Sequence, residues 1–281
     1  MQKTVLITGA SSGVGKASAC YFADQGWNVV ATMRNPSAGT VFKARANVAT
    51  MRVDVEDRTS IESAVAESIK RFGALDVLVN NAGYGLYGLF EATSREQIEQ
   101  QFNVNVFGVM DMMRAVLPHM RANKGGTIVN VSSGAGIFTL PLISSYCASK
   151  FALEGFSEAV SYELASQNII VKIIEPHGGI ASTNFGQRSS HEAASNTALP
   201  DYDAFVQRTN EAFATMRDAI MMDATDVARA IYEATTDGTT RLRYRVGDES
   251  RDLIRAHDDL SDEEYVAFMR ARFGIGELSP R

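Results

Sequence analysis

A tyrosine, a lysine and a serine in the middle of the chain have the types and spacing needed for acid–base chemistry on a carbonyl group. Tyr146 and Lys150 are four residues apart, and Ser133 lies thirteen residues before the tyrosine, after the apolar run 128–131. If the segment from Tyr146 is helical, the phenol and the ammonium group share one face, about 5–6 Å apart at Cβ. A phenol with a pKa near ~10 exchanges protons at neutral pH only where a cation favours the phenolate. Lys150 could be that cation.

Closely spaced glycines follow the first apolar run of the chain. Residues 4–8 predict a short buried strand, and Gly9, Gly13 and Gly15 come directly after it. A strand, a glycine-rich turn and a helix bind phosphate, because the glycines let the backbone approach a pyrophosphate and the free N–H groups of the helix attract its charge. A glycine turn without a cofactor is the alternative. The occurrence of the glycine-rich turn together with the Tyr–Lys pair favours a nucleotide site.

These motifs give the chain a recognisable pattern. It resembles the short-chain dehydrogenase/reductase family, whose members carry Thr-Gly-x-x-x-Gly-x-Gly, Asn-Asn-Ala-Gly, a serine and Tyr-x-x-x-Lys in this order. All four are present, at residues 8–15, at 80–83, at Ser133 and at Tyr146 with Lys150. The resemblance covers roughly residues 3 to 185. It implies hydride transfer between a nicotinamide cofactor and a ketone, an aldehyde or a secondary alcohol, with Tyr146 as proton donor and acceptor.

The resemblance implies four catalytic residues, which are Asn105, Ser133, Tyr146 and Lys150. Ser133 would hydrogen-bond the substrate oxygen where negative charge develops, and Lys150 would hold the nicotinamide ribose. Asn105 would anchor a water molecule for proton relay, with Asn103 as a rival. A serine hydroxyl that is satisfied by the backbone is the alternative for Ser133.

The resemblance also implies the residues that contact the cofactor. Asp54 and Val55 would hold the adenine, although Asp54 could simply cap a turn, and residues 81–83 would hold the adenosine ribose. The loop after residue 175 departs from the usual Pro-Gly of the family, because His177 separates Pro176 from Gly178. The complete predicted set is Gly9, Ser11, Ser12, Gly13, Val14, Gly15, Arg34, Asp54, Val55, Asn81, Ala82, Gly83, Tyr146, Lys150, Pro176, Gly178, Gly179, Ile180 and Thr183.

The end of the second predicted strand bears on the choice of cofactor. Sites for NAD place a carboxylate there for the ribose 2′-hydroxyl, whereas a 2′-phosphate needs a cation nearby. Met33 stands at that position and Arg34 follows it. A guanidinium can make bidentate hydrogen bonds to a phosphate. We expect NADP(H) to be preferred, with NAD(H) possible. The stretch 30–35 looks like that of the hydroxysteroid and retinol dehydrogenase-like subgroup.

Apolar runs alternate with amphipathic segments of helix length along the chain. Strands are predicted near 4–8, 28–33, 49–54, 75–80, 126–132 and 169–175, with strand-like sequence at 241–246 and helices near 224–236 and 261–273. This is the pattern of a doubly wound parallel sheet, a Rossmann-type α/β fold of about seven strands with helices on both faces. We expect one domain over residues 1–281, with a substrate loop and helices at about 183–223 and a C-terminal extension at about 224–281.

Composition limits the classes of partner. The net charge of −6 and the pI near 5.3 give no electrostatic reason to bind nucleic acid or an anionic membrane. Cys20 and Cys147 are far apart in sequence, and the four histidines lack a metal-binding spacing, so neither a disulfide framework nor a metal site is predicted. The sequence shows no signal peptide and no apolar run of membrane-spanning length. These features predict a cytoplasmic protein.

The predicted partner is a small molecule. Apolar segments at 84–90, 137–142 and 220–222 could line a pocket for a bulky apolar ketone or secondary alcohol, or could belong to the core or to a subunit interface. The C-terminal segment from residue 223 is a candidate for assembly into a homodimer or homotetramer. A non-catalytic protein that senses NAD(P) on the same fold is the alternative function, although such a sensor would need only the glycine loop.

Overall fold

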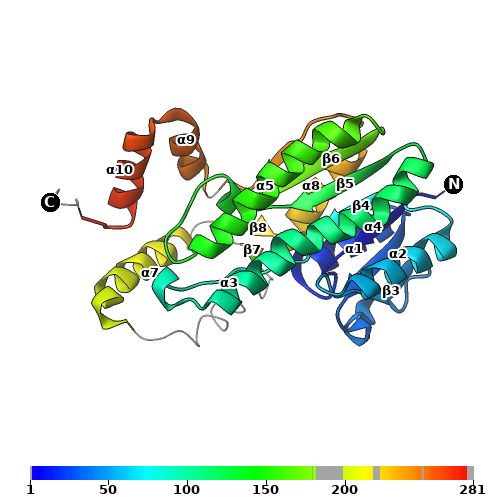
Figure 1. Cartoon of the computed structure of the whole chain (residues 1–281), viewed down its shortest axis with the longest axis horizontal. Helices are drawn as coiled ribbons and strands as arrows, with labels where there is room; N and C mark the ends of the chain where they lie inside the picture. The colour runs from blue at the N-terminus through cyan, green and yellow to red at the C-terminus, as the bar shows by residue number, and fades with distance from the viewer. Residues whose placement is uncertain (1, 179, 182–198, 218–221, 249, 277–281) are drawn as a thin grey trace.

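The computed structural model describes residues 2–178, 180–181, 199–217, 222–248 and 250–276 (Figure 1). Its main feature is a seven-stranded sheet in the order β3-β2-β1-β4-β5-β6-β9, in which all neighbouring strands are parallel. The strands of this sheet are β1 (Thr4–Ile7), β2 (Asn28–Met33), β3 (Val48–Arg52), β4 (Val77–Asn80), β5 (Gly126–Val131), β6 (Ile169–Pro176) and β9 (Arg243–Val246). Two short strands, β7 (Ile180–Ala181) and β8 (Met222–Asp223), pair with each other.

Helices cover both faces of the main sheet. The α-helices are α1 (Gly13–Asp24), α2 (Arg58–Phe72), α3 (Arg95–Phe102), α4 (Gly108–Ala122), α5 (Ser144–Ala165), α7 (Asp203–Arg217), α8 (Ala224–Thr236), α9 (Arg251–Asp259) and α10 (Asp262–Arg272). Shorter helical turns are η1 (Pro36–Ala38), η2 (Thr40–Phe42), η3 (Phe90–Ala92), η5 (Gly134–Gly136) and η6 (Pro200–Tyr202), and η4 (Asn103–Phe107) is a π-helix.

The two faces of the sheet form two separate apolar cores. On β1, Val5 and Ile7 pack into the core that contains Phe22 of α1 and Ile231 of α8. Leu6, between them, points to the opposite core, which includes residues of α2, α4 and α5. Consecutive strand residues point to opposite faces, so a strand that is covered on both sides must be apolar at nearly every position. This confirms the predicted doubly wound fold.

The order of the strands places a crevice at one edge of the sheet. The chain runs outward from β1 through β2 to β3 and then returns to β4, which pairs with the other side of β1. Strand order therefore reverses between β1 and β4. In open α/β sheets ligands bind at such a point, beyond the carboxyl ends of the strands. The glycine loop after β1 and the Asn-Asn-Ala-Gly segment at the end of β4 meet there.

The C-terminal part packs on the end of the molecule that lies beyond the carboxyl ends of the strands. Figure 1 shows α7, α9 and α10 gathered there. Ile137 and Phe138, which follow β5, share a small apolar core with Leu253 and Ile254 of α9. The predicted helix at 224–236 is confirmed as α8, and α7 occupies part of the predicted substrate segment. Helix α9 was not predicted. No helix in the described parts of the chain combines the length and apolar character of a membrane crossing.

Candidate active site

The glycine loop is tightly packed against its own backbone and against the segment after β4. Gly9 has a φ of +68°, and a Cβ there would lie 2.9 Å from the Cα of Ala82. A Cβ at Gly15 would overlap the Gly9 carbonyl and the side-chain amide of Asn81. Gly13, at the start of α1, also has a positive φ, of 53°. Side chains at Gly9 and Gly15 would therefore disrupt the loop.

A single threonine ties the glycine loop to the end of β4. The Thr8 hydroxyl accepts hydrogen bonds from the backbone N–H groups of Asn81 (2.9 Å) and Ala82 (3.0 Å). The Asn81 amide in turn donates to the Thr8 carbonyl at 2.9 Å. Asn81 therefore positions the glycine loop, a role in addition to the ribose contact implied by the family resemblance. Gly83 lies close to Asn105, whose Oδ1 would be 3.2 Å from a Cβ at that glycine.

Four further predicted cofactor residues lie near the start of α1 and after the end of β2. Ser12 precedes α1 in an extended conformation, and the first turn of this described helix carries no acidic side chain that would repel a phosphate. Ser11 is exposed and Val14 is half-buried. Arg34 is exposed immediately after the buried Met33, at the end of β2.

Asp54 and Val55 follow β3, which is separated from β4 by two strands, β2 and β1. The Asp54 carboxylate accepts a hydrogen bond from the Glu56 N–H at 3.3 Å, so it caps a turn, as the alternative interpretation held. Val55 packs tightly against Gly108, because a Cβ at that glycine would lie 2.8 Å from the Val55 Cβ. Both residues therefore have structural contacts of their own.

The tyrosine, the lysine and the serine come together at the start of α5. Tyr146 and Lys150 are both buried, and the Lys150 Nζ lies 5.8 Å from the centroid of the phenol ring. The Lys150 ammonium donates to the Val131 carbonyl at the end of β5, at 2.9 Å. Ser133 begins η5, and its Oγ accepts a hydrogen bond from the Ala135 N–H at 3.1 Å. The serine that follows β5 and the tyrosine and lysine of α5 thus form one cluster.

Burial dominates the protonation of this cluster in the chain alone. It raises the pKa of Tyr146, while the hydrogen bond with Ser133 acts in the opposite direction. Burial also lowers the pKa of Lys150 to about 8, opposed by the charge of Glu154. In the chain by itself the pKa of the phenol is therefore raised overall, whereas the expected lowering involves Lys150 together with the oxidised nicotinamide ring. Burial disfavours the charged forms of the phenol and the ammonium by more than the nearby hydrogen bond and charge favour them.

Asn105 joins the cluster from the opposite side through a local irregularity of the helix. It lies in the π-helix η4, a distortion that frequently marks functional sites. Its amide donates to the Tyr84 carbonyl (3.0 Å) and to the Ser149 Oγ (3.1 Å). Ser149 in turn donates to the Tyr146 carbonyl at 2.8 Å. The rival Asn103 is exposed, so only Asn105 reaches the buried site.

The loop after β6 reaches the same end of the sheet. Pro176 ends β6, and His177 is buried, with a backbone N–H that donates to the Val246 carbonyl at 2.9 Å. His177 packs against Gly134, where an added Cβ would lie 2.8 Å from the histidine Cβ. Gly178 is exposed with a φ of 102°, and Ile180 belongs to β7. Gly179 and Thr183 lie outside the described residues.

Sequence reasoning missed three charged residues beside this cluster. Glu154, Glu175 and Arg243 come from α5, β6 and β9, and both carboxylates are buried. The Arg243 Nε lies 3.0 Å from Glu154 and 3.4 Å from Glu175. One signal was available, because Glu154 is four residues after Lys150 and so shares its helical face.

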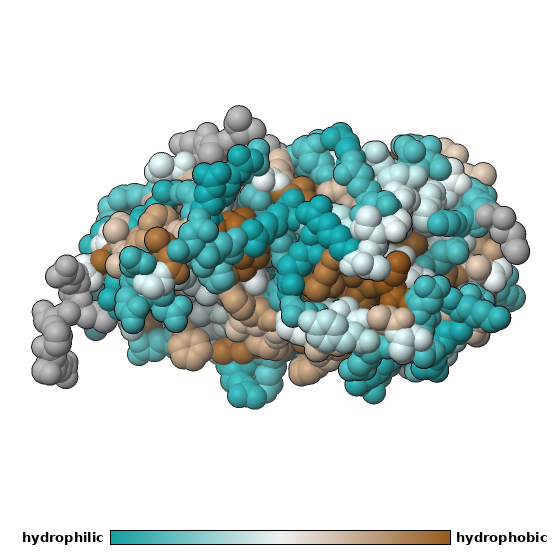
Figure 2. All heavy atoms as spheres, turned by 90° about the horizontal axis from the view of Figure 1, so that it is seen from above, coloured by the Kyte–Doolittle hydropathy of each residue, from teal (hydrophilic) through white to brown (hydrophobic). Residues whose placement is uncertain are grey.

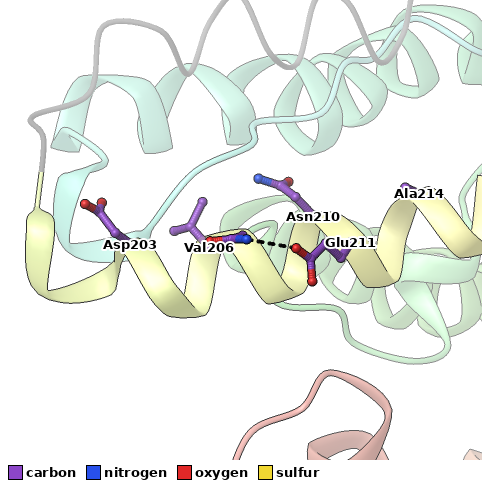
Figure 3. Close-up of a pocket in the computed structure, with 6 residues that line it drawn as sticks. Asp203, Val206, Asn210, Glu211 and Ala214 are labelled. Atoms are coloured by element: carbon purple, nitrogen blue, oxygen red, sulfur yellow. Dashed lines mark hydrogen bonds between the residues drawn. The ribbon is translucent and has the colours of Figure 1, made fainter.

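Two surface features lie apart from the buried cluster. A hollow along α7 is lined by Asp203, Val206, Gln207, Asn210, Glu211 and Ala214 (Figure 3). None of the predicted site residues belongs to it. Figure 2 shows apolar patches between polar side chains on the face seen from above. Large apolar side chains at the surface of η4 and α5 include the exposed Phe107, Phe151 and Tyr162.

Known proteins share this arrangement. The profile described as short chain dehydrogenase matches residues 3–194. Human 17-beta-hydroxysteroid dehydrogenase type 1 is 33% identical over 286 residues, which cover 96% of this chain and 86% of the human protein. The 3-ketodihydrosphingosine reductase of Bacteroides thetaiotaomicron is 44% identical over 172 residues, or 61% of this chain and 62% of that protein.

Solved structures agree with the sequence relatives. A short-chain dehydrogenase from Streptomyces avermitilis superposes with a TM-score of 0.83 at 32% identity, covering 99% of both chains. A short-chain dehydrogenase/reductase from Burkholderia phymatum in complex with NAD gives 0.78 at 25% identity, covering 92% of this chain and 94% of that one. ElxO with NADP bound gives 0.71 at 26% identity, covering 87% and 98%. With its motifs, its fold and these relatives in agreement, the chain belongs to the short-chain dehydrogenase family and is similar to its hydroxysteroid dehydrogenase subgroup.

Proposed function

We propose that the protein is an oxidoreductase that interconverts a ketone or aldehyde with the corresponding alcohol, using NADP(H) in preference to NAD(H). The observation that carries this proposal is the cluster of the buried Tyr146 and Lys150 with the half-buried Ser133 at the carboxyl edge of the sheet, beside the tightly packed glycine loop after β1. Structures of relatives with NAD and with NADP support a nicotinamide cofactor.

The crevice fits such a cofactor. Gly9 and Gly15 allow the loop to pack closely on Asn81 and Ala82, and the N-terminus of α1 would present backbone N–H groups to a pyrophosphate. When bound, the nicotinamide supplies or accepts the hydride. Arg34 is exposed at the end of β2 and offers a cation for a 2′-phosphate. The other residues predicted to contact the cofactor remain proposals.

The buried cluster supplies the proton chemistry. Ser133 holds the substrate oxygen, and Tyr146 donates a proton to it during reduction or accepts one during oxidation. Lys150 contributes a positive charge near the phenol, which favours the phenolate. The positive charge of the oxidised cofactor adds to this effect, so the raised pKa of Tyr146 in the chain alone falls when the site is loaded. Asn105 anchors a proton relay from the far side.

We infer a bulky apolar substrate from the side chains around the site. Ile137 and Phe138 follow Ser133 and η5 and pack with α9, which gives the substrate side an apolar wall. Two relatives, the human 17-beta-hydroxysteroid dehydrogenase type 1 and the bacterial 3-ketodihydrosphingosine reductase, have names that are consistent with this class. We further propose that residues 1–281 act as one cytoplasmic unit and that the exposed aromatic residues of η4 and α5 assemble it into a homodimer or homotetramer. Sedimentation showing only monomer would remove the last proposal.

The decisive experiment is a turnover screen. NADPH oxidation is followed with a panel of apolar ketones, NADP⁺ reduction with the matching alcohols, and both are repeated with NADH and NAD⁺. We expect turnover with at least one bulky ketone and a lower dissociation constant for NADPH than for NADH. Tighter binding of NADH would reject the cofactor preference. Cofactor binding without turnover on any substrate would favour a non-catalytic NAD(P) sensor.

A further inference from the structure

A buried carboxylate lies one helical turn beyond the lysine of the proposed active site. Glu154 is four residues after Lys150 on α5, and it is only 6% exposed. Its charge opposes the fall in the pKa of Lys150 that burial causes. Burial equally raises the pKa of Glu154 itself, and the contacts with Arg243 act against that rise. The charge on the lysine thus depends on a carboxylate that itself needs a counter-charge.

That counter-charge comes from the C-terminal part of the chain. The Arg243 Nε donates to Glu154 at 3.0 Å, and its Nη2 donates to the more exposed Glu158 at 2.5 Å. Arg243 belongs to β9, and it meets Glu154 across 89 positions of sequence. A buried carboxylate without such a partner would become protonated. Arg243 therefore favours the ionised form of Glu154.

The other charged groups around this contact come from β6, β9 and α9. Glu175 of β6 lies 3.4 Å from Arg243 and 3.7 Å from Arg245. Arg245 also pairs with Asp258 of α9 at 2.8 Å, and His257 lies 3.6 Å from the same aspartate. Burial and the charge of Glu154 raise the pKa of Glu175 to about 7. The contact with Arg243 favours the ionised form of Glu154, whereas burial and the neighbouring charge of Glu154 favour the protonated form of Glu175.

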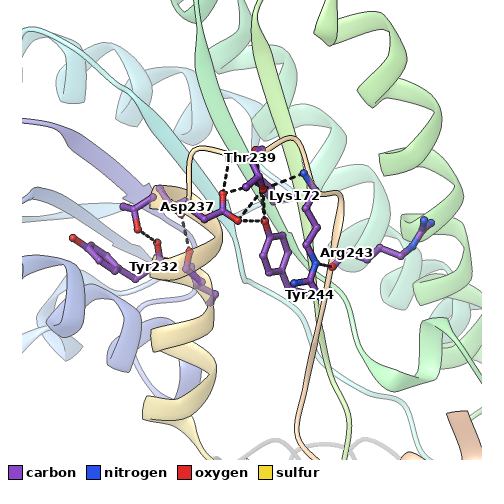
Figure 4. Close-up of polar contacts among 10 residues, drawn as sticks. Lys172, Tyr232, Asp237, Thr239, Arg243 and Tyr244 are labelled. Carbon is purple, nitrogen blue, oxygen red and sulfur yellow. Dashed lines mark hydrogen bonds and ion pairs between the residues drawn. The ribbon is translucent and has the colours of Figure 1, made fainter.

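A second polar cluster fixes the strand that delivers Arg243 (Figure 4). The buried Lys172 ammonium of β6 donates to the Thr239 carbonyl and to the Tyr244 hydroxyl, each at 2.7 Å, and pairs with Asp237 at 3.2 Å. Neighbouring residues of a strand point to opposite faces. With Tyr244 held on the Lys172 side of β9, Arg243 must extend towards α5.

We propose that Glu154, held ionised by Arg243, is a positioning residue that keeps Lys150 protonated and thereby sets the pH at which Tyr146 exchanges its proton. This inference rests on the proposed function, because it concerns the same acid–base pair. It adds a part that the Tyr-x-x-x-Lys motif does not contain, in which the last strand of the sheet controls the charge state of the site.

The direction of the effect follows from the charges. In alcohol oxidation Tyr146 must be a phenolate, so turnover rises with pH through an apparent pKa that belongs to the coupled tyrosine and lysine. Without the negative charge of Glu154, Lys150 loses its proton at a lower pH, and the phenolate loses its neighbouring cation. The apparent pKa for oxidation should then rise by about one unit, the lower end of what a nearby charge supplies.

The experiment compares the pH dependence of kcat for oxidation in matched variants. Glu154→Gln should shift the profile to higher pH by about one unit, lose about tenfold in turnover on the acidic limb and recover at alkaline pH, with KM unchanged. Glu154→Asp should restore part of the shift. Glu158→Gln is the control, because it contacts Arg243 from the same helix but lies a further turn from Lys150. Its profile should match that of the wild type.

Two further measurements make the result decisive. Arg243→Gln removes the counter-charge of Glu154 from the side of β9 and should shift the pH profile in the same direction as Glu154→Gln. It provides the test if Glu154→Gln fails to fold. Side-chain NMR of Lys150 in the cofactor-free protein, assigned with Lys150→Met, should show a lower titration midpoint in Glu154→Gln than in the wild type. Equal profiles, or equal shifts in the Glu154 and Glu158 variants, would overturn the inference. If the wild type has no turnover, the proposed function fails, and the NMR midpoints alone decide whether Glu154 controls Lys150.

Discussion

The glycine crevice and the acid–base cluster lie at the same edge of the sheet, but they are built in different ways. The crevice is made of backbone, which Thr8 and Asn81 join by hydrogen bonds of 2.9 Å. The acid–base cluster is made of side chains, and the buried Glu154 beside it accepts a hydrogen bond from Arg243 of a distant strand. Backbone geometry can be specified by a few glycines close together in sequence. A buried charge needs partners that only the complete sheet brings near it.

The strongest test of this separation is to remove the chemistry and keep the crevice. Tyr146→Phe should lower turnover by about 10³-fold, within the range for the loss of a general acid–base group. Its dissociation constant for NADPH should stay near that of the wild type, because the phenol does not support the glycine loop. Steady-state kinetics and fluorescence titration measure the two quantities. Tyr162→Phe, an exposed change on the same helix, should alter neither; turnover retained by Tyr146→Phe would refute the assigned role.

The reverse experiment damages the crevice and spares the cluster. In Gly15→Ala the new methyl group overlaps the Gly9 carbonyl and the Asn81 amide. Overpacking of this kind costs about 1–3 kcal/mol, so NADPH should bind roughly 10–100-fold more weakly. Titration calorimetry measures the change. Gly155→Ala adds the same methyl group on α5 with no heavy atom within 4 Å of it, and unchanged cofactor binding is expected. Equal losses in both variants would show that the loop packing is unimportant.

The smallest effect is expected from the hydrogen bonds of Lys172 that fix β9, which belong neither to the glycine crevice nor to the acid–base cluster. Lys172→Met removes hydrogen bonds to a charged group, but Asp237 remains partly in water, so we expect a loss of about 1–2 kcal/mol in unfolding free energy. Lys70→Met, an exposed change, should cost nothing measurable. Chemical denaturation measures both.

The same variant has a pH signature. Burial acts to raise the pKa of Asp237, but hydrogen bonds from Tyr244, Thr239 and Lys172 prevail and lower it. A lowered carboxyl pKa stabilises the fold above the unfolded value of about 4, and that stabilisation is lost as the pH falls through the folded value. The gap between wild type and Lys172→Met should therefore be largest above pH ~4 and narrow in acid. A gap that is constant with pH would exclude the ion pair as its source.

Local patterns predicted most of the fold. The apolar runs at 28–33 and 169–175 became β2 (Asn28–Met33) and β6 (Ile169–Pro176), and the helix at 224–236 became α8 (Ala224–Thr236). Helix α9 was missed because its sequence is highly charged and only Leu253, Ile254 and Ala256 are buried. Those three residues need the segment after β5 to complete a core, and that contact cannot be seen in a local window of sequence.

Prediction of the candidate site from the sequence was limited in the same way. Glycine spacing and the Tyr–Lys spacing pointed to the crevice and to the start of α5, because each motif is short and local. Glu175 and Arg243 carried no such signal, since charged residues in a sequence are expected at the surface, and Glu154 carried only its spacing of four from Lys150. Their significance depends on burial and on pairing across strands. For the same reason the sequence could not show that burial raises the pKa of Tyr146 in the chain alone.

The position of β9 at the edge of the sheet has a consequence for synthesis. The ribosome makes the glycine loop and the first five strands of the sheet before residue 132, and that part can begin to pack as it emerges. Arg243 is made more than a hundred residues later and takes its place only when β9 pairs with β6. A nascent chain can therefore hold a nucleotide crevice well before its tyrosine and lysine have the electrostatic surroundings of the finished protein.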